Sequence, residues 1–159
     1  MNQARHIAIV AALLAAAGCH RSPPRRKAPH VEIRGHRWFV DVAMTAEQRY
    51  HGLAGRQHLP QDVGMLFVYP EPQVLDFCMR GCLTPIDIAF IDRDLRVVQM
   101  HAMQVEPDQA GRVSYSSNVP AQYALEVAAG SLRTAGVRVG DRVTFSAGIP
   151  PATKAEGGP

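Results

Sequence analysis

Two cysteines four positions apart, Cys78 and Cys82, have the most distinctive chemistry in this sequence. In an exported protein two such thiols usually form a disulfide. On a straight strand their Cα atoms would lie roughly 13 Å apart, whereas a disulfide requires less than about 7 Å. Pairing therefore needs a bend, which Gly81 permits. We predict a disulfide between them. Two unpaired buried thiols, or a reactive or metal-bound pair, are the alternatives.

Arg49 and Arg56 also have the spacing of a site, because seven residues are two helical turns and would place both side chains on one helix face if the helix extended that far. With Met65 and the carboxylate of Asp87, they would line a pocket that holds an anionic or sugar-like ligand through bidentate hydrogen bonds. The alternative is a structural Arg–Asp bridge between a helix and a sheet. Both interpretations stay open at the level of the sequence.

The sequence gives little support to catalysis. It contains no nucleophile elbow, phosphate-binding loop or HExxH motif. The candidate acids are Asp41, Asp76, Asp87 and Glu126. Nothing in the sequence pairs two of them, so it does not decide whether the protein is an enzyme, although a binding role is favoured.

A soft-metal site suited to Cu(I) would combine the two cysteines with nearby thioether and imidazole groups. These are Met65, Met79, Met100, His101 and Met103. Adjacent residues on a strand point to opposite faces, and methionine is ordinary core material. We therefore predict no metal and no cofactor.

The first residues are typical of a bacterial lipoprotein signal. Arg5 supplies positive charge, residues 7–17 are apolar, and Ala16-Ala17-Gly18-Cys19 resembles a lipobox. The apolar segment is too short to span a hydrocarbon core of about 30 Å. We predict a signal peptide over residues 1–18 and a lipid on Cys19. An ordinary signal peptide that leaves Cys19 free is the alternative.

The rest of the chain divides into a tether, one domain and a tail. Residues 19–30 are rich in proline and basic residues and lack apolar periodicity, so we predict a solvated tether. His20 stands where an inner-membrane retention signal has Asp, so we expect the periplasmic face of the outer membrane. Residues 31–147 form the domain, and residues 148–159 a disordered tail. Much of the net charge of +3 lies in the tether, and no basic face for nucleic acid is visible.

The domain shows the alternation that predicts short strands. Thr45 and Gln48 have the spacing of a capping box at a helix start. The predicted strands cover 31–33, 38–42, 65–69, 74–79, 86–91, 96–103, 123–127 and 142–146, the predicted helices 45–53 and 131–135, and a loop 106–120. We predict a mainly β (α+β) fold, a compact and partly closed β-barrel-like sheet of seven to eight strands with one or two short helices, as a monomer.

Three blocks of residues occur in a recognisable order. The first holds Arg49, Gly52, Leu53 and Arg56; the second is Gly64-Met65-Leu66-Phe67; the third holds Phe77, Met79, Pro85, Asp87, Ala89, Phe90 and Asp92. Together they resemble the signature of domain-of-unknown-function family 192, which reads R-x-x-G-L-M-x-R, G-M-L-F and F-W-M-K-N-T-x-x-P-L-D-I-A-F-I-D. Leu125-Glu126-Val127 and Gly140-Asp141 also fall where that family has L-E-V and G-D.

This resemblance implies a small β-rich, barrel-like domain of bacterial, often exported, proteins, and it implies no activity. Ala54, Cys78, Gly81 and Cys82 replace residues that are typical of the family. We therefore interpret the chain as a lipid-anchored envelope protein that binds a small polar or anionic ligand or serves as an accessory module. An envelope hydrolase with Asp87 as acid or base, acting on a carbohydrate-like substrate, is one alternative. A thiol- or copper-handling protein is the other.

The lipoprotein interpretation predicts that a palmitate analogue labels the protein in cells through Cys19. Metabolic labelling should mark the wild type and leave the Cys19→Ser variant unmarked, because the acylated thiol is then missing. Equal labelling of the two proteins would contradict the prediction.

Overall fold

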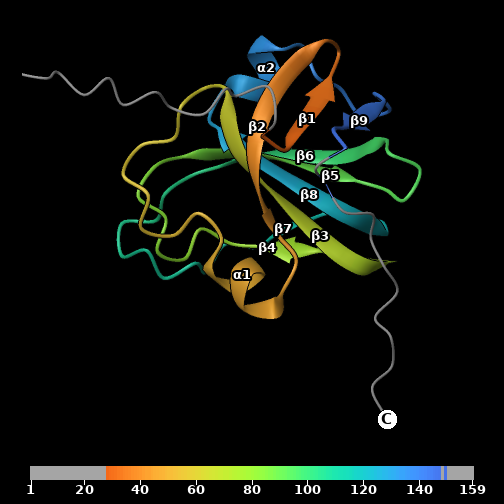
Figure 1. The fold of residues 1–159 in the computed structure, drawn as a ribbon. Coiled ribbons are helices and arrows are strands. Elements are labelled where there is room, and N and C mark those ends of the chain that lie inside the picture. Colours follow the sequence, from red (N-terminus) through yellow and green to blue (C-terminus); the bar gives the residue numbers. More distant parts are fainter. Residues whose placement is uncertain (1–27, 148, 150–159) are drawn as a thin grey trace, which may run out of the picture.

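A computed structural model describes residues 28–147 and Ile149 of the chain (Figure 1). The strands are β1 (His30–Ile33), β2 (His36–Ala43), β3 (Val63–Gln73), β4 (Asp76–Phe77), β5 (Ile86–Ile91), β6 (Val97–Met103), β7 (Tyr115–Ser116), β8 (Ala121–Ala128) and β9 (Val143–Phe145), and the helices are α1 (Ala46–His51) and α2 (Ser131–Thr134). The predicted signal peptide, Cys19, most of the tether and nearly all of the tail lie outside the described residues.

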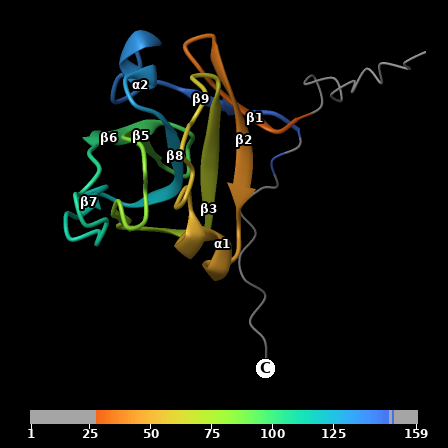
Figure 2. The ribbon, with the colours of Figure 1, turned by 90° about the vertical axis from the view of Figure 1, so that its left-hand side faces the viewer.

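Seven strands form one curled sheet in the order β6-β5-β8-β3-β2-β1-β9, and β4 pairs with β7 in a small second sheet. The curl brings the two edge strands together at one corner, where the Gly140 amide donates to the Val97 carbonyl at 2.7 Å. An isolated bridge joins Arg96 to Arg142 at the same corner. The sheet is thus a half-barrel, with α1 and α2 at opposite ends of it (Figure 2). The predicted mainly β, partly closed barrel is confirmed.

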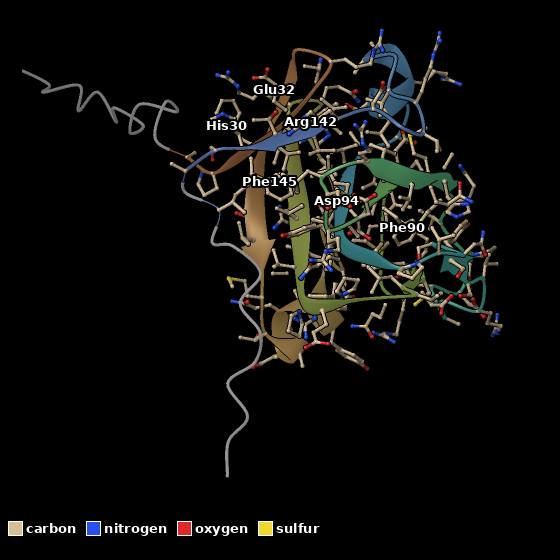
Figure 3. The ribbon with its side chains drawn as sticks, turned by 90° about the vertical axis from the view of Figure 1, so that its right-hand side faces the viewer. His30, Glu32, Phe90, Asp94, Arg142 and Phe145 are labelled. Carbon is tan, nitrogen blue, oxygen red and sulfur yellow. The ribbon has the colours of Figure 1, made fainter. Side chains whose placement is uncertain are left out.

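Local signals in the sequence correspond to local structure. β1 and β2 form the predicted antiparallel hairpin, with Ile33 opposite His36. The predicted capping box is present at α1, where the Gln48 amide donates to the Thr45 hydroxyl and the Gln48 side chain accepts from the Thr45 amide. At the far edge of the sheet β1 pairs with β9, with Val31 opposite Phe145 (Figure 3).

The loop predicted between β6 and β8 is not entirely irregular. β7 lies within it and pairs with β4, with Asp76 opposite Ser116. The predicted strand 74–79 is correspondingly short. The Ser117 side chain accepts a hydrogen bond from the Leu75 amide, and the Ser117 amide donates to the Leu75 carbonyl, so this pairing fixes only the start of that segment.

β2 and β3 run parallel, so a crossover must join them. That crossover carries α1 and leads back through Leu53 and Leu59, which are both buried. The ring of Phe67 on β3 lies under Gly52, at the end of α1. The crossover therefore covers one face of the sheet, and α1 lies over the edge of that face.

Two hydrophobic cores lie on opposite faces of the sheet. The first core fills the inside of the half-barrel, where Tyr123 of β8 meets Phe145 of β9 with ring centroids 5.0 Å apart. Ile149 also packs there. The second core lies on the outer face, where the ring centroid of Phe77 is 4.9 Å from that of Phe67 and 5.6 Å from that of Phe90. Because both faces are covered, all six residues of β5 are buried.

Asp87 of β5 is one of the few buried charged residues, with 6% of its surface exposed. Its carboxylate accepts a hydrogen bond from the Leu132 amide of α2 at 3.2 Å. Nearby, Trp38 donates to the Ser131 hydroxyl at 2.8 Å, and Ser131 donates to the Gln61 carbonyl. These bonds attach α2 to the sheet. None of the helices in the described part of the chain is long and apolar enough to cross a membrane.

Asp87→Ala should therefore destabilise the fold by about 1 to 3 kcal/mol, because it leaves the buried Leu132 amide without its acceptor. Urea denaturation followed by tryptophan fluorescence measures this, since Trp38 lies beside α2. Asp94→Ala, in an exposed turn, is the matched control and should change stability by less than about 0.5 kcal/mol. Equal stability of Asp87→Ala and the wild type would contradict a structural role for Asp87.

Candidate functional site

The structure does not bring the four predicted pocket residues together. Arg49 and Arg56 lie on the outer face of the sheet with α1, and Met65 packs in the second core beneath them. Asp87 lies on the inner face, beside α2, and lines a separate hollow. The predicted pocket of Arg49, Arg56, Met65 and Asp87 is therefore wrong as a single site. The reason is strand alternation, because Asp87 shares its face with Ala89 and Ile91 of the first core.

A different carboxyl group occupies the outer face. Glu126 of β8 pairs across the sheet with Met65 of β3 and Ile88 of β5. Both partners belong to the second core, so the Glu126 side chain points toward α1. Only 4% of its surface is exposed. The acid of this face is thus Glu126, and not Asp87.

A glycine lets the backbone of the strand that carries this side chain come close to β3. A Cβ on Gly64, opposite Val127 on β8, would lie 2.3 Å from the Glu126 carbonyl oxygen and 2.9 Å from the Val127 side chain. Only a residue without a side chain lets β3 approach β8 this closely. Gly64 opens the Gly-Met-Leu-Phe block, so this block sets how closely β3 packs against β8, the strand that carries Glu126.

Glu126 faces a cavity of about 360 Å³ between α1, β3 and β4. Arg49, Tyr50 and His51 of the helix line one side of it. The opposite wall and floor are formed by Phe67, Tyr69, Asp76, Phe77, Cys78, Arg80, Cys82 and Glu126. The cavity therefore combines two guanidinium groups, aromatic walls and a buried carboxyl group.

The Glu126 carboxyl group has no hydrogen-bond partner among the residues that the structure describes. Burial raises its pKa to about 8, and the Arg56 guanidinium lowers it only in part. At neutral pH Glu126 is therefore mostly protonated and can donate a hydrogen bond into the cavity. A buried carboxyl group with a perturbed pKa that faces a cavity is typical of functional sites.

The two arginines of the cavity are held in place. Arg49 donates to the Met44 and Val68 carbonyls, the latter at 3.0 Å, and its guanidinium lies 4.7 Å from the Tyr69 ring centre. Arg80 lies 4.0 Å from the Tyr50 ring centre and donates to the Tyr50 carbonyl. Burial raises the pKa of Tyr69, so its phenol is neutral under ordinary conditions. The guanidinium groups remain the positive charges of the cavity.

Arg56 forms an ion pair, but with a different aspartate from the Asp87 of the structural alternative. Arg56 donates to the carboxylate of Asp41 on β2 at 2.6 Å. Both residues line a second hollow on the other side of Gly52, together with Met65. The bridge attaches the segment after α1 to the sheet, because α1 ends at His51 and Arg56 lies beyond it.

The predicted disulfide is not formed in this structure, where Cys78 and Cys82 are free thiols. The chain does bend at Gly81, with φ of +67°, and the Cys82 amide donates to the Met79 carbonyl. The side chains take other positions, however. The Cys82 thiol packs in the second core near the Arg80 carbonyl, and Cys78 lies under Gly111. The bend alone therefore does not pair the sulfurs.

The alternative of a reactive thiol has no support at Cys82. Burial, with smaller contributions from Glu126 and Cys78, raises its pKa to about 11, so the thiolate that would react is scarce. Within residues 28–147 and Ile149, no group of three or more His, Cys, Asp and Glu side chains could hold a metal ion.

Sequence reasoning named Glu126 only as one of several candidate acids. The available signal was a charged residue inside the apolar run 123–127, at the position of the family's L-E-V motif. A lone acid in a strand covered on both faces must be buried, which marks it as unusual. What the sequence could not provide was the face on which this acid lies.

The fold and this cavity define a class of small β half-barrel domains with a buried acid beneath a helical crossover. The chain belongs to the DUF192 family, described as "Uncharacterized ACR, COG1430", which matches residues 29–145. A search of curated proteins gives no match.

The solved structures that are similar to this chain include two bacterial proteins. One is described as a "putative transcription regulator" from Sinorhizobium meliloti 1021, with 28% identity, a TM-score of 0.66, and coverage of 74% of this chain and 91% of that chain. The other is a protein of unknown function from Novosphingobium aromaticivorans DSM 12444, with 28% identity, a TM-score of 0.66, and coverage of 73% and 82%. Both likenesses extend over most of the domain.

The raised pKa of Glu126 should make the protein less stable as the pH rises. Between the unfolded pKa of 4.5 and the folded value of about 8, the unfolded chain releases a proton that the folded protein keeps. Stability should fall on the order of 2 to 3 kcal/mol between pH 5.5 and pH 8.5. Urea titrations at the two pH values measure this.

Glu126→Gln should remove most of this fall and be more stable than the wild type at pH 8.5, because an amide never ionises. Glu71→Gln changes an exposed carboxyl group on β3 and should lose as much stability between the two pH values as the wild type does. The titration of Glu106 does not interfere, since hydrogen bonds from the Arg112 and Val113 amides lower its pKa. An unchanged fall in Glu126→Gln would contradict the assignment.

Proposed function

We propose that this protein is a lipid-anchored binding module of the bacterial envelope, and that its ligand is a small organic anion held in the cavity beneath α1. The anchor is the acylated Cys19, and residues 19–30 tether the domain to the periplasmic face of the outer membrane. The cavity replaces the pocket that the sequence predicted, keeps Arg49 from it, and adds Arg80 and Glu126.

One observation carries the proposal. Glu126 is buried, faces the cavity, and has no hydrogen-bond partner among the described residues. Buried polar groups are nearly always hydrogen-bonded, so a carboxyl group that reaches a cavity without a protein partner bonds to water or to a ligand there. We propose that a ligand in the cavity takes the place of that water.

The other groups of the cavity indicate what such a ligand carries. Arg49 and Arg80 provide two positive charges, and only Asp76 among the exposed groups of the cavity provides a negative one. Phe67, Tyr69 and Phe77 add apolar walls suited to a planar or aliphatic body. This combination favours a molecule with one charged end and an apolar part.

Acid-catalysed hydrolysis is a second candidate function, favoured by the presence of Asp76 in the same cavity. A protonated carboxyl group beside an exposed one is the arrangement that glycosidases use. Glu126 would be the acid, because Asp87 lies on the other face of the sheet. We place binding first, since Asp76 already accepts a hydrogen bond from the Ser114 hydroxyl at the edge of the cavity.

Benzoate, as a probe with one carboxylate and an apolar ring, should stabilise the protein, whereas the neutral isostere benzamide should not. At ten times its Kd a ligand adds about 1.4 kcal/mol of stability, which raises Tm by about 4 to 6 °C for a domain of this size. Differential scanning fluorimetry at constant ionic strength measures the shift.

Arg80→Gln should reduce the benzoate shift by at least half, because it removes one of the two guanidiniums of the cavity. Arg112→Gln is the matched control, since Arg112 is exposed, pairs with Asp108 and does not line the cavity. Equal shifts with benzoate and benzamide, or no shift with either, would count against the proposed function.

A further inference from the structure

We infer that the cavity recognises a monocarboxylate through a proton held between Glu126 and the carboxylate of the ligand. The inference rests on the proposed function and adds the ligand's chemical class and the protonation state in which it binds. It stands on the position of Glu126 in the sheet, on the groups that surround it, and on the charge of the cavity.

The backbone of Glu126 is held in place by the strands on both sides of it. β8 lies in the middle of the sheet, hydrogen-bonded to β3 on one side and to β5 on the other. Its neighbours in register, Met65 and Ile88, belong to the second core and are both buried. The carboxyl group therefore cannot turn toward solvent without disrupting the core, and the cavity is the space that it faces.

No group that packs around Glu126 takes its proton. Arg56, from the segment after α1, favours the ionised form of Glu126 electrostatically, but its guanidinium donates to Asp41 at 2.6 Å. Tyr69 of β3 and Cys82 after β4 both have raised pKa values and are protonated at neutral pH. Three residues of α1, Arg49, Tyr50 and His51, and three around β4, Asp76, Cys78 and Arg80, complete the titratable groups that line the cavity with it. Glu126 is thus a hydrogen-bond donor that lacks an acceptor.

The charges of the cavity fit one negative group. With Glu126 protonated, Arg49 and Arg80 contribute two positive charges and Asp76 one negative charge. A monocarboxylate neutralises the remaining single positive charge. Its carboxylate oxygen can accept the short, charge-assisted O–H···O⁻ bond that a carboxylic acid donates. The two carboxyl groups then share one proton, because two carboxylates at hydrogen-bond distance cannot both be ionised.

Proton sharing makes binding depend on pH in one direction. The ligand is ionised throughout the neutral and alkaline range, so the titrating group is Glu126. With its pKa of about 8, the protonated fraction of Glu126 falls about 30-fold between pH 7.0 and pH 9.5. The Kd for a carboxylate should therefore rise about 30-fold over this range.

Isothermal titration calorimetry of the full chain with benzoate at pH 7.0 and pH 9.5 tests the inference. The wild type should lose about 30-fold in affinity. Glu126→Gln should bind several-fold more weakly than the wild type at pH 7.0, because an amide is a weaker donor, yet change by less than threefold between the two pH values. Glu71→Gln, exposed and outside the cavity, should follow the wild type.

A second measurement uses the wild type alone and does not depend on how any variant folds. At pH 8.5, titrations in buffers of different ionisation enthalpy should show uptake of about 0.75 of a proton per benzoate bound, the fraction of Glu126 that is ionised in the free protein with a pKa of about 8. The absence of proton uptake, or an equal loss of affinity in Glu126→Gln, would overturn the inference while leaving the binding site in place. No binding of benzoate at either pH would overturn the proposed function itself.

Discussion

The position of β8 between β3 and β5 is the constraint on which both cores and the cavity depend. Hydrogen bonds to both neighbours hold the strand, and seven of its eight residues are buried because each face of the sheet carries a core. A carboxyl group in this layer must find a partner inside the protein or face a cavity. Asp87 is in the first situation, with the Leu132 amide. Glu126 is in the second.

The sequence predicted the elements of this fold better than its site. Signals that act within a few residues were reliable, such as the capping box of Thr45 and Gln48 and the hairpin before β2. The face of Asp87 was not predictable from Ile86–Ile91, because a strand that is buried on both faces has no alternation of polar and apolar residues. Its face is decided by the register with β8, which lies more than thirty residues further along the chain.

The cysteines show the same limit in another form. The bend at Gly81 was predictable from the residue type and is present. Whether the two sulfurs meet depends on what packs around them, and here the second core takes Cys82 while the segment at Gly111 covers Cys78. Gly111 is far from Cys78 in sequence, and the second core gathers residues from Ala43 to Ala128. The glycine at position 81 permits the bend, and contacts with other segments decide where each sulfur lies.

The helix over the cavity is attached differently from the strands beneath it. α1 has no buried residue, and its connections are the capping box, the hydrogen bonds of Arg49, and the contact between Arg80 and Tyr50. Elements held by exposed hydrogen bonds open at a lower free-energy cost than elements held by a core. The cavity therefore has a rigid floor of strands and a side that can move to admit a molecule.

The pairing of β1 with β9 has a consequence for the order in which the protein folds. Val31 and Phe145 are partners at opposite ends of the domain, so the outer edge of β1 forms its hydrogen bonds only after β9 has been synthesised. Contacts of such long sequence separation slow folding, because loop closure must be completed before they contribute. Until that moment the hairpin of β1 and β2 carries an open edge, whose unpaired backbone amides and carbonyls are free to pair with a strand of another chain.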